Sequence, residues 1–240
     1  NIGNPASFAF LRTTVLDNGL YGKYSSYQSE QEKLETWSGN LAYLALGFTL
    51  RSPINEVMDK AKSPWKYGMG FSLTPYTVVG YNVITRENIS EPAVDSVSSN
   101  YTGSGGTYRF TWSNAMRYKN TAAGINLGWQ FGETVYENTN VFSDSFPTFI
   151  NTYRDQISVT GFVWKLGVQH DWALKYAEND KDVALKFITF GLSGEGKHKM
   201  RTTSDVLRVR SRGVQSNGQF NDPDTLLVAD NVRRDLTIPA

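Results

Sequence analysis

The chain has 240 residues with a formal net charge of +1, 13% aromatic residues, 21 glycines and no cysteine. The length fits one large domain, and the near-neutral charge argues against a nucleic-acid partner. Without thiols, thiolate zinc sites and disulfide frameworks are excluded. The chain also lacks the ~18-residue apolar run that a membrane-spanning helix needs.

Several stretches of the chain alternate bulky apolar residues with small or polar ones, which is typical of β-strands. In Trp65–Val83 the odd positions are mostly bulky and apolar, and the even positions carry mainly Gly, Ser, Thr, Lys and Asn. We predict seven strands, at about 13–27, 43–51, 65–83, 107–118, 123–132, 162–169 and 183–197, and the start of an eighth at 233–238.

The strands are long, and aromatic residues stand at several of their ends. At about 3.3 Å per residue, Trp65–Val83 would span roughly 60 Å, beyond the ~20 Å of ordinary strands. Long strands with one apolar face, one polar face and terminal aromatics predict an all-β fold, an antiparallel transmembrane β-barrel with its apolar face toward lipid.

The predicted connections alternate between shorter links and longer polar ones. The longer ones lie at about 28–36, 86–106, 137–153 and 200–232. Bacterial barrels have short periplasmic turns and long extracellular loops, so we expect this set outside the cell. Because an open wall would leave unpaired strand edges in lipid, we also expect the chain to be only part of a larger barrel.

Several short motifs resemble the FadL-like outer-membrane barrels, most closely those of Bacteroidetes. They are Gly3-Asn4-Pro5-Ala6-Ser7, Leu41–Phe48, Leu73–Tyr76, Val79–Tyr81, Gly103–Gly106, Trp112–Ala115 and Gly161-Phe162. The resemblance implies a bacterial outer-membrane barrel of about 14 strands, of which this chain holds the first seven or eight. Residues 1–12 would then be the end of an N-terminal hatch and its lead-in, and residues 13–240 a partial barrel wall.

Pro75 stands within the third predicted strand, where a proline marks an edge, a bulge or an opening because it donates no ladder hydrogen bond. In the family that the chain resembles, a kink in this strand opens a lateral gap for hydrophobic ligands. The resemblance therefore makes Asn4, Pro5, Ala6 and Pro75 the candidate ligand or gating residues, with Asn4-Pro5-Ala6 near Pro75 on the lumen side. The alternative is a local β-bulge through which no ligand passes.

The sequence offers no candidate catalytic residues, no metal ligands and no cofactor motif, so we expect neither an enzyme nor a cofactor. His170 and His198 are the only histidines, and neither has a second histidine at the spacing of a metal site. Arg208, Arg210 and Arg212 alternate, which indicates either a contact with lipopolysaccharide or an ordinary polar strand.

Two functions fit these observations. The first is a passive uptake channel for hydrophobic small molecules, with lateral release into the membrane. The second is a non-transporting accessory or scaffold subunit of a larger outer-membrane secretion or assembly complex. Outer-membrane lipid and lipopolysaccharide are expected partners of both, and the second adds other outer-membrane proteins. An apolar lumen holding lipid would favour the first, and a large contact with another barrel the second.

Overall fold

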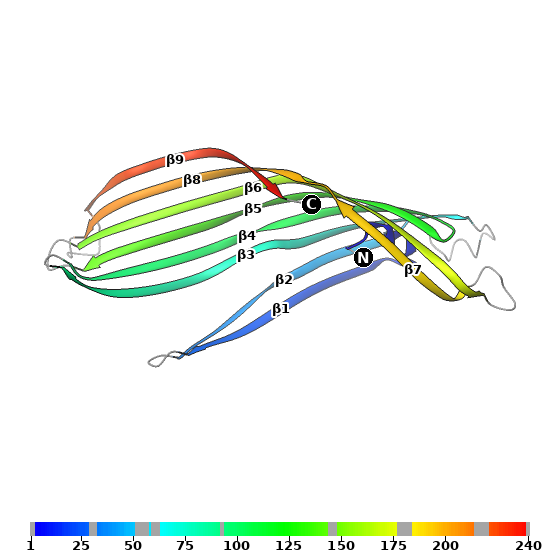
Figure 1. The fold of residues 1–240 in the computed structure, drawn as a ribbon, viewed down its shortest axis with the longest axis horizontal. Helices are drawn as coiled ribbons and strands as arrows, with labels where there is room; N and C mark the ends of the chain where they lie inside the picture. The colour runs from blue at the N-terminus through cyan, green and yellow to red at the C-terminus, as the bar shows by residue number, and fades with distance from the viewer. Residues whose placement is uncertain are drawn as a thin grey trace.

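The computed structural model describes residues 3–28, 33–50, 58, 63–91, 94–143, 148–176, 184–213 and 221–238. They form a short 3-10 helix, η1 (Pro5–Phe10), and an antiparallel sheet (Figure 1). The nine strands of these residues are β1 (Val15–Gln28), β2 (Lys33–Thr49), β3 (Trp65–Glu91), β4 (Val94–Tyr118), β5 (Thr121–Ser143), β6 (Thr148–Tyr176), β7 (Ala184–Glu195), β8 (His198–Gly213) and β9 (Asn221–Ile238). No described helix is long and apolar enough to cross a membrane.

Each strand from β1 to β6 pairs with the next one along the chain. β6 then pairs with two strands, with β7 along Lys165–Tyr176 and with β8 along Thr148–Thr160. β7 and β8 therefore share one position in the wall, and the nine described strands make eight positions. Among the described residues β1 and β9 are the two edges of the sheet and do not pair with each other, so the wall is open.

The polar stretches that we predicted as long loops are largely strand. β3 and β4 stay paired out to Glu91 and Val94, and β5 and β6 out to Phe142 and Phe149. β8 and β9 likewise pair through most of 200–232. Backbone ladders hold these parts together, and a stretch that is polar on both faces shows no period-2 pattern in the sequence. Their extracellular side stays a prediction.

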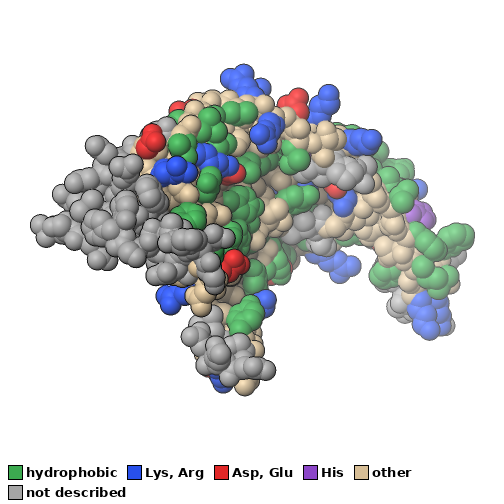
Figure 2. Space-filling view, turned by 60° about the vertical axis from the view of Figure 1, so that its left-hand side comes forward, with side chains coloured by type: hydrophobic (Ala, Val, Ile, Leu, Met, Phe, Trp, Pro, Cys, Tyr) green, Lys and Arg blue, Asp and Glu red, His purple; other side chains and the backbone are tan. Residues whose placement is uncertain are grey.

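The small side chains of the strands point to one face of the sheet and the bulky ones to the other. On β4, Ser113 and Thr111 are buried, whereas Trp112 and Phe110 are 40% and 42% exposed. The six-residue η1 packs on the small-residue face and contacts five strands, β2 to β6. Because neighbouring strands lie about 4.8 Å apart, this contact requires the sheet to curve around η1. The small-residue face is therefore concave, and the sheet arches over a hollow (Figure 2).

A β-bulge interrupts β3 directly after Pro75. The register with β4 passes from Pro75 opposite Tyr108 to Thr77 opposite Thr107, which leaves Tyr76 as an extra residue. One extra residue inverts the faces of everything that follows it in a strand.

The inversion corrects our assignment of the third predicted strand. Val79, Tyr81 and Val83 continue the odd-numbered series but lie on the concave face, and the Tyr81 ring covers Gly103 of β4. The prediction that they belong to the outer apolar face is wrong, because the period-2 pattern carries no sign of the inserted Tyr76.

At the level of the β3 bulge, the backbones of the neighbouring strands β4 and β5 are also irregular. Gly105 of β4 and Gly132 of β5 have φ values of +100° and +145°, which side chains other than glycine rarely adopt. A Cβ at either position would overlap the backbone of the neighbouring strand. We call the part of β3–β6 on the short-turn side the lower wall (residues 65–75, 108–118, 121–131 and 160–170). The remainder of these strands is the upper wall.

Candidate functional site

The N-terminal motif that we singled out begins η1 and fastens it to the wall. Pro5 occupies the first turn, and the Asn4 side chain accepts a hydrogen bond from the Ala6 N–H at 3.0 Å. The same side chain donates through Nδ2 to the carbonyl of Val168 on β6, at 3.2 Å. Asn4 therefore caps the helix and anchors it at once.

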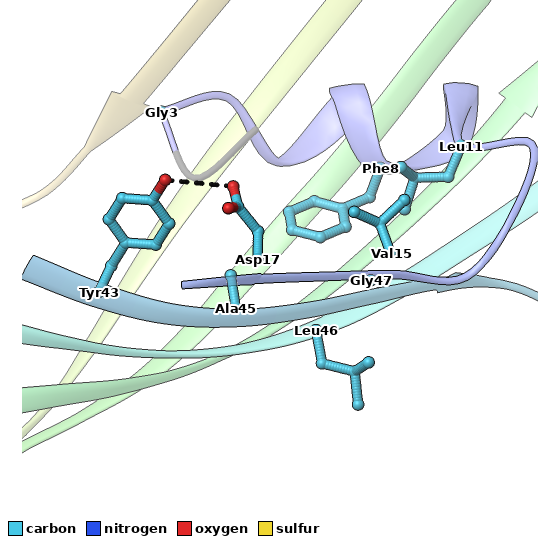
Figure 3. A pocket seen from close by; sticks show the side chains of 9 residues that line it. All are labelled: Gly3, Phe8, Leu11, Val15, Asp17, Tyr43, Ala45, Leu46 and Gly47. Atoms are coloured by element: carbon cyan, nitrogen blue, oxygen red, sulfur yellow. Dashed lines mark hydrogen bonds between the residues drawn. The ribbon is translucent and has the colours of Figure 1, made fainter. Parts of the chain in front are cut away.

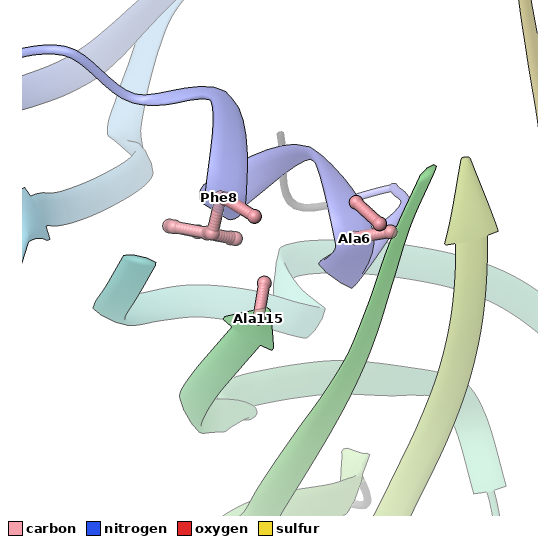
Figure 4. Packing of buried hydrophobic residues seen from close by; sticks show 5 residues of the cluster. Ala6, Phe8 and Ala115 are labelled. Carbon is pink, nitrogen blue, oxygen red and sulfur yellow. The ribbon is translucent and has the colours of Figure 1, made fainter. Parts of the chain in front are cut away.

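η1 lies on a floor of glycines. Phe8 packs on Gly68 and Gly70 of β3, and the backbone of Pro5 lies against Gly124 of β5. Any side chain at Gly68 or Gly124 would overlap the backbone of η1. The exposed fractions of Ala6, Phe8 and Ala9 are 0%, 4% and 2%, and Figure 4 shows Ala6 and Phe8 beside Ala115 of β4. Close backbone packing thus holds η1 inside the hollow of the lower wall.

A cavity of about 470 Å³ lies between η1 and the β1–β2 pair. Its apolar lining includes Phe8, Leu11 and Val15, and at one end the Tyr43 hydroxyl donates to the Asp17 carboxylate at 3.2 Å (Figure 3). The arrangement is an apolar cleft with one hydrogen-bonded polar pair.

The wall opens between β2 and β3. As far as the structure describes them, these strands pair from Thr49 opposite Gly68 to Leu44 opposite Leu73. The β1–β2 pairing continues to Gln28, and the β1–β2 hairpin separates from the rest of the sheet above Leu44 (Figure 1). We call the space between the two strands above this point the β2–β3 opening.

Pro75 stands where the β2–β3 ladder stops. The N–H of Leu50, the residue directly after β2, donates to the Tyr67 carbonyl of β3 at 3.0 Å, so the backbone groups of Tyr67 point toward β2. Because this direction alternates along an antiparallel strand, the backbone of Leu73 and then of Pro75 also points toward β2. Pro75 has no N–H to donate, so the ladder lacks its next donor at the position where the opening begins.

The structure brings Asn4, Pro5 and Ala6 together but keeps them away from Pro75. Their contacts lie on β5 and β6, and the part of β3 beneath η1 is at Gly68 and Gly70. Pro75 stands five positions beyond Gly70, about 16 Å farther along the strand. The expected proximity is wrong, because η1 sits near the short-turn end of the wall. Ligand or gating roles for the four residues stay predictions.

Arg109 is a functional candidate that the sequence did not reveal. It projects from β4 into the hollow at the level of the bulge, where its guanidinium lies 4.6 Å from the centre of the Tyr76 ring. The same group donates to Gln130 Oε1 of β5 at 3.0 Å, and Gln130 is 2% exposed. The sequence does contain a signal for it, because Arg109 is a large charged residue on a strand face that otherwise carries small residues such as Thr111 and Ser113.

Two of the alternating arginines contact residues of the wall itself. Arg208 lies 2.8 Å from the Asp155 carboxylate, and Arg210 Nε donates to Asn151 Oδ1 at 3.1 Å. Asn151 is buried on the concave face, so both arginines face the hollow. Their proposed contact with lipopolysaccharide is therefore wrong, and the side chain of Arg212 lies outside the described residues.

The two histidines lie apart. His170 Nδ1 is 2.8 Å from the Thr121 hydroxyl, and the His198 ring meets the Trp164 ring edge-on at 6.1 Å. In the part of the chain that the structure describes, no three His, Asp or Glu side chains come together as metal ligands.

The family model of BamG matches residues 1–204, from η1 into β8. BamG is named for a component of the BAM outer-membrane assembly complex. No curated protein and no solved structure matches the chain. The match overturns the resemblance to FadL-like proteins and the uptake channel that rested on it, since short motifs such as Asn4-Pro5-Ala6 are weaker evidence than a match over most of the chain. The protein belongs to the BamG family and is a protein of the bacterial outer membrane.

Proposed function

We propose that the protein is a non-transporting structural subunit of the BAM outer-membrane assembly complex. The match over residues 1–204 carries this proposal, and it favours the second of the two functions that the sequence left open. Other outer-membrane proteins are then its partners, held by its wall or its upper end.

The dimensions of the lower wall support its insertion into the membrane as a barrel wall. Trp65–Pro75 of β3 comprises 11 residues before the bulge, about 33 Å of strand. At the tilt of roughly 40° usual in outer-membrane barrels, this length is about 25 Å high, which is the height of their apolar band. The exposed outer residues of β4–β6 at these levels include Phe110, Trp112, Met116, Trp129, Phe162, Trp164, Leu166 and Val168.

The two ends of this band also match a membrane. At the short-turn end Trp65 and Tyr118 form an aromatic pair with ring centroids 4.6 Å apart, the residue types that favour the lipid interface. At the other end Phe131 is followed on the same face of β5 by the exposed Glu133, which accepts a hydrogen bond from Ser158 at 3.2 Å. In this proposal lipid chains contact the lower wall, and lipopolysaccharide contacts the polar outer face above it.

The position of η1 supports a structural role rather than passage through the wall. η1 rests on glycines of the four strands β2, β3, β5 and β6 and buries Ala6 and Phe8 in the hollow. Moving it would separate backbone surfaces that are in direct contact, together with the Asn4 anchor on β6. A wall reinforced in this way suits a subunit that holds partners.

Purification of the tagged protein from native outer membranes in mild detergent tests the proposal. We expect other components of the BAM complex to co-purify in fixed proportion, and depletion of the protein to lower the amounts of other outer-membrane proteins. An unrelated tagged barrel from the same membranes is the control. If the protein purifies alone, and its depletion leaves outer-membrane protein levels unchanged, the proposal is wrong.

A further inference from the structure

In the described part of the chain, the edge of β3 that faces β2 pairs with no strand above Pro75. A Cβ at Gly106 of β4 would overlap the carbonyl oxygen of Thr77, so the backbone of Thr77 faces β4. The alternation of backbone direction then turns the N–H and C=O groups of Val78, Gly80 and Asn82 toward the β2–β3 opening. Within the described residues, β2 stops pairing at Leu73 and no other strand takes its place on this edge.

Across the opening, the edge of β2 above Leu44 likewise has no paired strand among the residues that the structure describes. Leu44 is its last residue paired with β3. The Leu41 N–H, on this edge, is bound by the side chain of its neighbour Asn40 at 2.8 Å. The backbone groups of Gly39 and Trp37 follow Leu41 on the same side. Two strand edges therefore face the opening, each with donors and acceptors about 6.6 Å apart.

The hairpin beside the opening carries exposed apolar side chains. Leu20 and Trp37 are 78% and 77% exposed, and the Tyr24 and Trp37 rings lie 5.0 Å apart. The register places them on the same outer face as Leu44. A two-stranded hairpin is at best marginally stable alone, and an unpaired strand edge is a ready template for pairing with another chain. The opening therefore calls for an occupant that satisfies backbone groups.

An extended polypeptide segment fits this requirement, since its backbone repeats donors and acceptors at the spacing of both edges, whereas lipid chains have none. We propose that the β2–β3 opening is a strand-addition site, in which a segment of a partner outer-membrane protein pairs with the free edges of β2 and β3. The identification of the partner as an outer-membrane protein rests on the proposed function. The two strand edges themselves are observed in this chain and do not depend on it.

Hydrogen exchange measured by mass spectrometry tests the pairing directly. In the complex isolated from membranes, the amides of residues 37–41 and 78–84 should exchange at least about tenfold more slowly than in the protein separated from its partners. The amide of Thr107, which donates to Thr77 Oγ1 within the wall at 3.1 Å, should exchange equally in both. Equal rates at the two edges in both samples would overturn the proposal.

Asn82→Pro removes one donor from the free edge and leaves the ladder to β4 intact, as Pro75 already does lower on the strand. Asn82→Ala is the matched control. A photoreactive phenylalanine analogue at Val78 or at Trp37 should give adducts with one and the same segment of a partner protein. Asn82→Pro should reduce both adducts by about tenfold or more, whereas Asn82→Ala should keep them. The analogue at Trp112, on the outer lower wall, reports lipid contact.

Adducts from both edges that contain only lipid, or other residues of this chain, would contradict the proposal. Should Asn82→Pro fail to fold, the exchange rates of the unaltered protein decide. If the complex forms but both edges exchange freely, strand addition fails and the proposed function stands. If both edges are protected by a protein outside the BAM complex, strand addition stands and the proposed function fails.

Discussion

The carbonyl of Phe8 lies directly over Gly68, in the space that a side chain at position 68 would need. Backbone meets backbone at this point, with the Phe8 side chain 4% exposed between η1 and β3. The contact explains why glycine stands beneath η1, and it makes the seating of η1 sensitive to a single methyl group.

We therefore expect Gly68→Ala to loosen η1 and to lower the free energy of unfolding by about 1–3 kcal/mol, because the added Cβ overpacks a close contact. Thermal unfolding in detergent and protease cleavage within residues 3–12 measure the two effects. Gly80→Ala on the same strand is the control, since a Cβ there meets nothing within 4 Å. Equal protease resistance of the two variants would show that η1 does not depend on Gly68.

The limits of the lower wall can be tested with arginine. Phe71→Arg places a charge on the outer face near the middle of the proposed apolar band and should cost about 2–4 kcal/mol of insertion free energy. Ile84→Arg, at a position 61% exposed above the bulge, should cost much less because that level lies beyond the band. The folded protein recovered in the outer-membrane fraction is the measurement. Equal losses from both variants would contradict the assignment of the band.

Pro75→Ala restores an N–H that points toward β2, and Pro75→Val adds a β-branched side chain to it. If the absent donor ends the ladder, both variants should extend the β2–β3 pairing by one hydrogen bond and gain about 0.5–1.5 kcal/mol of stability. Slow exchange of the new amide at position 75 is the direct readout. A fast-exchanging amide in both variants would mean that the hairpin separates for another reason.

Arg109 and Gln130 form a buried hydrogen bond at the level of the bulge. Arg109→Met leaves the Gln130 carbonyl unpaired and should cost about 1–3 kcal/mol. Adding Gln130→Leu to this variant removes the unpaired group and should recover part of the loss. Chemical denaturation of the two single variants and the double variant forms a double-mutant cycle. Additive losses would show that the two side chains act independently.

The sequence alone determined the faces of the lower wall. Trp112 and Trp129 are exposed, and their neighbours Ser113 and Gln130 are buried, as the alternation predicted. Each strand's own backbone sends successive side chains to opposite faces, so this property needs no knowledge of neighbouring strands. The cap at Asn4-Pro5 is also a local signal, but the assignment of residues 1–12 did not use it and rested only on the family resemblance.

Tertiary structure decided the features that depend on two strands at once. The extra residue at Tyr76, which reverses the faces of β3, exists only in the register with β4. The direction of the missing Pro75 donor follows from the Leu50–Tyr67 hydrogen bond, and the glycine floor becomes a site only where η1 lies on it. Alternation is local to a chain segment, whereas register, bulges and backbone contacts are set by the partner strand or helix. The sequence could therefore place the proline but not the opening beside it.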